Sequence, residues 1–144
     1  MIPYAVAALA LGLGSGLLEP SWPQWWEVLL LPPMLVLYPA LIEEAIFRGL
    51  LLPRTLNAGP PRRRVTAVAL STGLFVLMHP LNHWLVGLSD TSSFTDPVFL
   101  VIVTLLGLTC AVQRLWSPSL WLPIATHWAT VVAWHLFLGR DLAV

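Results

Sequence analysis

Three ionisable side chains stand together inside a long apolar stretch of the chain. The run EEAIFRG places Glu43 beside Glu44 and puts Arg48 four residues after the second glutamate. On a helix, Arg48 can pair directly with Glu44, whereas Glu43 points about 100° away. A purely structural ion pair would explain Glu44 and Arg48 but would leave the Glu43 carboxylate without a cation. A desolvated carboxylate is suited to accepting a proton, so the pattern favours general-base chemistry.

Two histidines in other apolar stretches can join these carboxylates. His79 follows Phe75 by four residues in FVLMHP, and His127 lies inside LPIATHWATVVAWH. An imidazole in hydrocarbon needs hydrogen-bond partners, which makes a plain core role less favourable. At about 1.5 Å per residue, Glu43 lies about 16 Å from Arg54, His79 about 22 Å from Arg64 and His127 about 20 Å from Arg114. The three side chains therefore lie at similar depths. We therefore expect these three side chains to meet in one water-accessible cavity.

The composition indicates which elements must position these groups. Hydrophobic residues make up 58% of the 144 residues and charged residues only 10%, against about 25% charged in soluble domains. This balance excludes a disordered chain. The chain has seven arginines, no lysine and a net charge of zero, which is too little positive charge for a nucleic-acid-binding face. The lone Cys110 excludes an intrachain disulfide and a cysteine-based metal cluster. The class of protein that remains is an integral membrane protein.

The apolar stretches predict an all-α membrane protein with a single domain over residues 1–144. We expect a compact bundle of about five transmembrane helices, some of them kinked by proline. The stretches cover about residues 1–18, 28–52, 65–81, 97–112 and 119–139. The first is open to a second interpretation as a cleaved signal peptide, although its start carries no Lys or Arg. His83 falls in the expected loop 82–96.

The arginines predict an orientation. Arg54 and Arg62–Arg64 fall in the loop 53–64, and Arg114 falls in the expected turn 113–117. By the positive-inside rule these loops are cytoplasmic, which places the N-terminus inside and the C-terminus outside. As a separate expectation, the membrane is a prokaryotic plasma membrane. Gly12 and Gly16 form a small-xxx-small step that favours helix packing.

The order EExxxR, FxxxH and a late inward histidine resembles the CPBP family. This is the CAAX-protease and bacteriocin-processing group, also called ABI or type II CAAX prenyl endopeptidase-like, and the resemblance covers about residues 35–138. It implies a glutamate-dependent intramembrane endopeptidase in which Glu43 and His79 activate a water. It further implies that Glu44 and Arg48 form an orienting pair and that His127 stabilises the oxyanion. Phe75 is the expected substrate contact in the FxxxH motif.

One position departs from the family pattern. Four residues after His127 the family has an asparagine, and this chain has Val131. Valine cannot donate a hydrogen bond, and the loss of one oxyanion donor typically raises a barrier by about 2.7–4 kcal/mol. Thr126, Thr130 or a backbone N–H would have to substitute, or activity is weak or lost. We expect Thr130 also to contact the substrate.

The resemblance further implies a membrane-anchored protein or peptide substrate, such as a CAAX-like segment or a C-terminal anchor or sorting segment. No cofactor and no nucleic acid are expected, and the lipid bilayer is the remaining partner. Two alternatives stay open. In the first, Glu43, His79 and His127 bind Zn²⁺ in a metal-dependent protease, although Arg48 would repel the cation. In the second, the chain is a non-catalytic immunity or scaffold protein of the same fold, which the missing asparagine favours.

Overall fold

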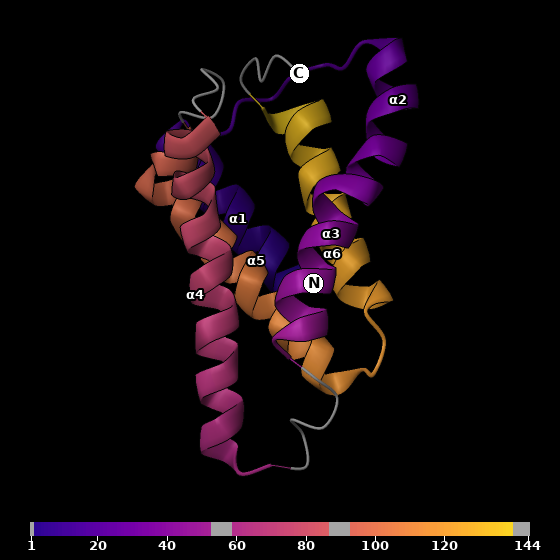
Figure 1. The fold of residues 1–144 in the computed structure, drawn as a ribbon. Coiled ribbons are helices and arrows are strands. Elements are labelled where there is room, and N and C mark those ends of the chain that lie inside the picture. Colours follow the sequence, from indigo (N-terminus) through magenta and orange to yellow (C-terminus); the bar gives the residue numbers. More distant parts are fainter. Residues whose placement is uncertain (1, 53–58, 87–92, 140–144) are drawn as a thin grey trace.

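The computed structural model describes residues 2–52, 59–86 and 93–139, and this part of the chain is helical without strands. Helices run over α1 (Ile2–Ser15), α2 (Trp25–Leu35), η1 (Val36–Leu41), α3 (Ile42–Glu44), η2 (Ala45–Leu50), α4 (Pro61–Val86), α5 (Pro97–Trp116), α6 (Trp121–Ala133) and η5 (Trp134–Leu138). The η segments are π-helical. Segments α2 to η2 follow one another directly, as do α6 and η5, so the described residues form five helical runs (Figure 1).

Three of these runs are long and apolar enough to cross a membrane, namely Trp25–Leu50, Pro61–Leu85 and Pro97–Trp116. Only 28% of the first span and 17% of the second are buried inside the protein. Large apolar side chains such as Leu30 and Leu70 therefore cover the outer faces, as expected for helices that face lipid. The predicted all-α membrane bundle is confirmed.

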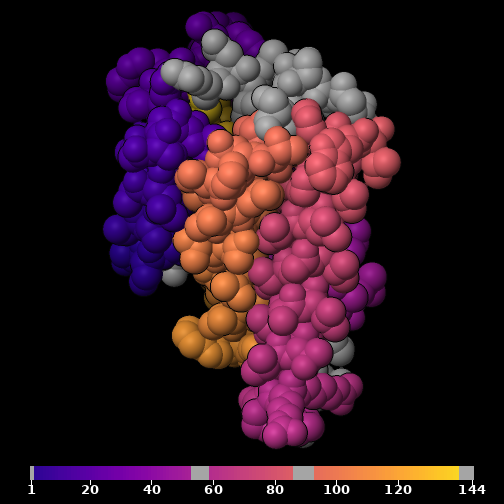
Figure 2. Space-filling view, turned by 90° about the vertical axis from the view of Figure 1, so that its left-hand side faces the viewer, coloured from indigo at the N-terminus to yellow at the C-terminus, as the bar shows by residue number. Residues whose placement is uncertain are grey.

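Helix α5 is the inner helix of the bundle. It packs against α1, α4 and α6, and Figure 2 shows it between α1 and α4. Its start is sharply defined, because the Asp96 carboxylate accepts hydrogen bonds from the backbone N–H groups of Val98 and Phe99. The buried aromatic core extends from α5 to its neighbours through Phe47, Phe75 and Phe99.

The second span is kinked, as its prolines predict. Tyr38 leaves the helical region with φ −138° and ψ 126°, because a residue before proline is pushed toward extended backbone. The kink separates α2 from the lower part of the span, α3 and η2. This lower part lies beside α6 (Figure 1). The indole N–H of Trp128 in α6 donates to the Pro32 carbonyl in α2 at 2.8 Å, which ties α6 to the upper part as well.

Two helices extend beyond the apolar stretches that predicted them. Helix α4 begins at Pro61, since proline fits the first helical turn, and it continues through Pro80 to Val86. His83 therefore lies in a helix and not in a loop. Helix α5 continues to Trp116, so Arg114 belongs to the helix and not to a turn. Hydropathy marks only the apolar part of a helix and misses its polar ends.

The arginines that predicted the orientation lie at helix ends where the structure describes them, and Arg114 is in the last turn of α5. Arg54 lies outside the described residues, and Arg62–Arg64 lie in the first turn of α4. This end of α4 projects beyond the other helices (Figures 1 and 2). The predicted orientation stays a prediction.

The expected pairing step at Gly12 and Gly16 was wrong. Helix α1 ends at Ser15, and Gly16 has φ 74°, the left-handed conformation that glycine often adopts just after a helix. The backbone N–H of Leu18 then donates to the Gly12 carbonyl at 2.9 Å. A Cβ atom on Gly12 would collide with the Leu18 side chain. Gly12 therefore makes room for the chain's own turn and not for a second helix.

Candidate active site

The three ionisable residues of the second span are buried side by side. Glu43 is 6% exposed, and Glu44 and Arg48 are fully buried. One helical turn separates the last two, and Arg48 Nη1 donates to Glu44 Oε1 at 3.0 Å. The expected Glu44–Arg48 ion pair is therefore present. The π-helical segment η2 follows α3 directly, and such widened turns are frequent at functional sites.

Arg48 also anchors this segment to α5 and α4. Its Nη2 donates to the Gly107 carbonyl of α5 at 2.9 Å. Its guanidinium lies 4.3 Å from the centre of the Phe75 ring of α4, a cation–π distance. A Cβ atom on Gly107 would lie 3.2 Å from Arg48 Nη2 and 3.0 Å from Thr72 Cγ2. Glycine at this position therefore allows the close approach that the Arg48 bond requires.

His127 lies between the two glutamates. It is 2% exposed, and its Nδ1 lies 3.0 Å from Glu44 Oε1. Since a carboxylate ion can only accept, Nδ1 carries the hydrogen. The other ring nitrogen, Nε2, lies 3.8 Å from Glu43 Oε2, which is too long for a direct hydrogen bond. Glu44 thus holds both Arg48 and His127, and it joins the second span to the last helix.

His79 approaches the same cluster from α4. Its Nδ1 lies 2.9 Å from the Phe75 carbonyl, so Nδ1 must donate and Nε2 keeps its lone pair in the neutral ring. The His79 and His127 rings both stand edge-on to Phe75, with centroids 5.1 and 5.6 Å away. Phe94 and Phe99 pack on His79 as well. Phe75 is fully buried and is the common packing centre of Arg48 and both imidazoles.

The motif residues therefore converge from three separate parts of the chain. Glu44 lies within 3.0 Å of Arg48 and of His127, and His127 lies 3.8 Å from Glu43. His79 meets them across the Phe75 ring. None of these side chains lies on the lipid-facing surface. Such a cluster can accept protons, donate hydrogen bonds and hold fixed charge, which are the requirements of hydrolysis inside a membrane.

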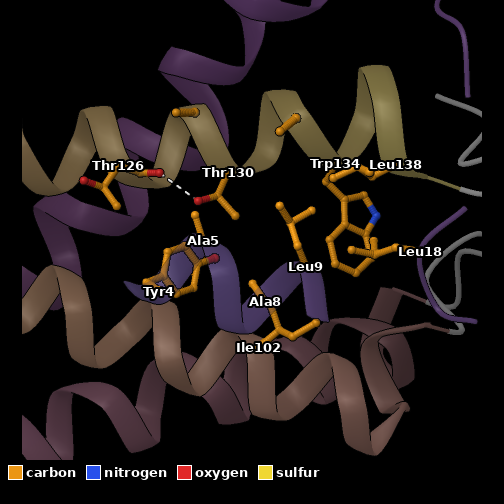
Figure 3. A pocket seen from close by; sticks show the side chains of 12 residues that line it. Tyr4, Ala5, Ala8, Leu9, Leu18, Ile102, Thr126, Thr130, Trp134 and Leu138 are labelled. Carbon is orange, nitrogen blue, oxygen red and sulfur yellow. Dashed lines mark hydrogen bonds between the residues drawn. The ribbon is translucent and has the colours of Figure 1, made fainter. Parts of the chain in front are cut away.

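A pocket of about 240 Å³ lies beside this cluster, between α1, α5 and α6. Figure 3 shows Tyr4, Ala8, Ile102 and Thr130 around it. Its walls are almost entirely apolar. Thr126, the residue before His127, lines the pocket, and Glu43, His79 and His127 do not. It is therefore a different space from the shared cavity that we expected.

The two predicted substrate contacts lie in different places. Thr130 lines the pocket, and its hydroxyl donates to the Thr126 carbonyl at 2.9 Å (Figure 3). The Phe75 ring is enclosed within the polar cluster and does not line the pocket. Val131, four residues after His127, is half-buried in α6.

Two buried polar residues near the cluster were missed from the sequence. Gln113 Nε2 donates to Thr126 Oγ1 at 2.9 Å, which joins α5 to α6 next to His127. Arg114 Nε donates to the Arg48 carbonyl at 3.2 Å. Their position after an apolar stretch suggested a turn. The helical spacing Gly107, Cys110, Arg114 along one face is the signal that would have found Arg114.

The predicted zinc alternative does not fit these positions. Within the described ranges, no group of three His, Cys, Asp or Glu side chains is arranged to hold a metal ion. The neighbouring carboxylate, Glu44, already accepts from Arg48 and His127.

The fold and the site together define a helical membrane protein with a buried glutamate, arginine and histidine cluster. A family model for type II CAAX prenyl endopeptidase Rce1-like proteins matches residues 23–133, which include all three motifs. The chain therefore belongs to the Rce1-like family of membrane proteases, and the resemblance predicted from its motifs is confirmed. Neither a search of curated proteins nor a search of solved structures found a significant match.

Proposed function

We propose that this protein is an intramembrane endopeptidase in which Glu43 and His79 activate a water that attacks a substrate peptide bond. The family supports a CAAX-type membrane protease in general. The observation that carries the residue assignment is His127, which lies between Glu43 and Glu44 although it comes from the other end of the chain.

Glu43 is the best placed proton acceptor of the cluster. Glu44 Oε1 is occupied by Arg48 and His127. Glu43 Oε2, like Glu44 Oε2, is buried and makes no hydrogen bond to another described residue. The two carboxylates differ because the ion pair of Arg48 is with Glu44, which leaves Glu43 as the carboxylate that this cation does not hold. As the water oxygen bonds to the carbonyl carbon, a water proton passes to Glu43, with the His79 Nε2 lone pair as the second acceptor. That proton then passes to the leaving nitrogen, so one water yields one carboxyl and one amine product.

His127 serves as the oxyanion donor in this proposal. Because Nδ1 already donates to Glu44, Nε2 can donate to the oxyanion only in the imidazolium form. In that form two cations, Arg48 and His127, face two carboxylates, Glu43 and Glu44, so the cluster is balanced in charge. Glu44 then has two tasks, because it orients the imidazole and stabilises its positive charge.

The missing asparagine makes this a slow enzyme. The hydroxyl groups of the two threonines that could replace it both donate hydrogen bonds to backbone carbonyls of their own helix. Thr126 Oγ1 donates to the Leu122 carbonyl at 3.0 Å, and Thr130 Oγ1 donates to the Thr126 carbonyl at 2.9 Å. Neither hydroxyl can assist the oxyanion without giving up that bond. His127 is therefore the principal donor.

The apolar pocket beside Thr126 suits an apolar segment of a membrane-embedded substrate. We therefore propose substrates with a CAAX-like segment or a C-terminal anchor or sorting segment. The decisive experiment coexpresses each tethered candidate with the wild type or with Glu43→Gln, and follows cleavage by the mass of the released product. Loss of the base should slow cleavage by about 10²–10⁴-fold. Glu27→Gln, far from the site in the first turn of α2, is the matched control and should cleave normally.

A second candidate, a non-catalytic membrane partner, is favoured by Val131 and by the occupied threonine hydroxyls. Full biological activity of Glu43→Gln would support this candidate and contradict the protease. Metal analysis of the purified protein, together with cleavage after chelation, tests the zinc alternative in the same experiment.

A further inference from the structure

Two arginines join the glutamate-bearing segment to α5 by bonds that run in opposite directions. Arg48, in η2, donates through Nη2 to the Gly107 carbonyl of α5 at 2.9 Å. Arg114, in α5, donates through Nε to the Arg48 carbonyl of η2 at 3.2 Å. Gly107 and Arg114 are seven residues apart in the sequence, so they share one face of α5 about two turns apart. The two helices are thus fastened together at two levels.

The Arg48 carbonyl has a particular need for this donor. It belongs to the last turn of η2, where carbonyl groups lack partners within their own helix. A guanidinium at this place also complements the negative end of the helix. Arg114 is 7% exposed, so water cannot easily replace it.

The same side chain reaches the turn that leads to α6. Arg114 Nη1 donates to the Ser117 carbonyl at 3.2 Å. The next part of this turn is packed on η2, because a Cβ atom on Gly49 would lie 3.3 Å from Leu120 Cδ1. One planar guanidinium therefore contacts the end of η2 and the turn before α6. Segment η2 follows α3, which carries Glu43, and the turn leads into α6, which carries His127.

We infer that Arg114 is a positioning residue for the candidate active site. It acts through the Arg48 carbonyl and the Ser117 carbonyl, and it holds η2 and the start of α6 in one frame. In this way it sets the separation of 3.8 Å between Glu43 Oε2 and His127 Nε2. The positioning stands on the geometry alone, and only its effect on turnover rests on the proposed function. The fork of Arg can serve two carbonyls at once, which the single ammonium of Lys does poorly.

The test compares Arg114→Gln and Arg114→Lys with Arg63→Gln, which is exposed at the outer end of α4. All are studied as full chains in lipid nanodiscs. Amide hydrogen exchange is followed over residues 45–50 and 117–121, with α1 and the middle of α4 as internal references. Where a tethered substrate is cleaved, kcat and KM are measured separately.

Arg114→Gln should lose at least about tenfold of its exchange protection in the two segments, while the reference helices keep theirs. Its kcat should fall by about 10–100-fold with KM changed less than about twofold, since displaced groups slow the chemical step. Arg114→Lys should recover part of both effects, and Arg63→Gln should match the wild type.

Two results would overturn the inference. The first is Arg114→Gln with unchanged exchange in both segments. The second is an equal loss of protection in every helix, which would show a general role in folding. If Arg114→Gln does not fold, Arg114→Lys serves as the test variant. Exchange rates and a kcat equal to those of the wild type in Arg114→Lys would then refute a positioning role. If Glu43→Gln still cleaves normally, the proposed function is wrong. The exchange data would still test whether Arg114 positions the two segments.

Discussion

The two sides of α5 hold the protein together by different means. Toward η2 the contacts are directional, because Arg48 and Arg114 each donate to a backbone carbonyl across the interface. Toward α1 the contacts are apolar, and an apolar pocket of about 240 Å³ remains between α1, α5 and α6. Directional bonds fix distances within a few tenths of an ångström, whereas apolar packing tolerates changes of shape. The polar side is therefore suited to chemistry and the apolar side to accommodating varied apolar groups.

The sharpest test of this contrast removes the charge at the centre of the polar side. Arg48→Met should lower the free energy of unfolding by about 3–5 kcal/mol, because it leaves Glu44 buried without its cation. Unfolding is measured in mixed micelles by circular dichroism. The exposed Arg62→Met is the control and should change stability by less than about 0.5 kcal/mol. Equal stability of both variants would show that the ion pair does not hold this side together.

A second variant adds a donor to the polar side. Val131→Asn restores the residue type that the family pattern has four positions after His127. An added oxyanion donor should raise kcat by about 10²–10³-fold, measured on any tethered substrate that the wild type cleaves. A gain for Asn that the similarly polar Val131→Thr does not match would identify the amide as the donor. An unchanged kcat would show that His127 alone completes the oxyanion site.

A third variant tests how closely the helices must approach on the polar side. Gly107→Ala should lower the free energy of unfolding by about 1–3 kcal/mol, because the new methyl group meets Thr72, Phe75 and Arg48 at 3.0–3.2 Å. Gly73→Ala in α4 is the matched control. A Cβ atom there has no neighbour within 4 Å, so alanine should be neutral or slightly stabilising. Equal behaviour of the two variants in thermal unfolding would contradict the close contact.

The smallest effect on folding is expected on the apolar side. Ala133→Leu places a larger side chain in the pocket and should change the free energy of unfolding by less than about 1 kcal/mol. It should nevertheless raise KM about tenfold for substrates with bulky apolar segments, since one methylene changes selectivity at least this much. Ala125→Leu, on the exposed face of the same helix, is the control. A uniform fall in kcat without a change in KM would show that the pocket does not receive substrate.

Much of the fold was predictable because long apolar stretches indicate helices that span lipid. The five apolar stretches, the kink before Pro39 and the start of α5 at Pro97 all follow from local rules of composition and backbone sterics. Helix ends were less predictable. Arg114 was mistaken for a loop charge because hydropathy says nothing about a polar residue that finds buried carbonyl partners.

The sequence by itself determined the membrane class, the Glu44–Arg48 pair and the family, since these depend on composition, on one helical turn and on motif order. Only the tertiary structure decided that Glu44 also holds His127, that Phe75 packs between the two imidazoles, and that the pocket opens beside the cluster. The physical reason is that these contacts join residues from helices far apart in the chain. The distances between these residues are set by how the helices pack, so they cannot be predicted from residue spacing within one helix.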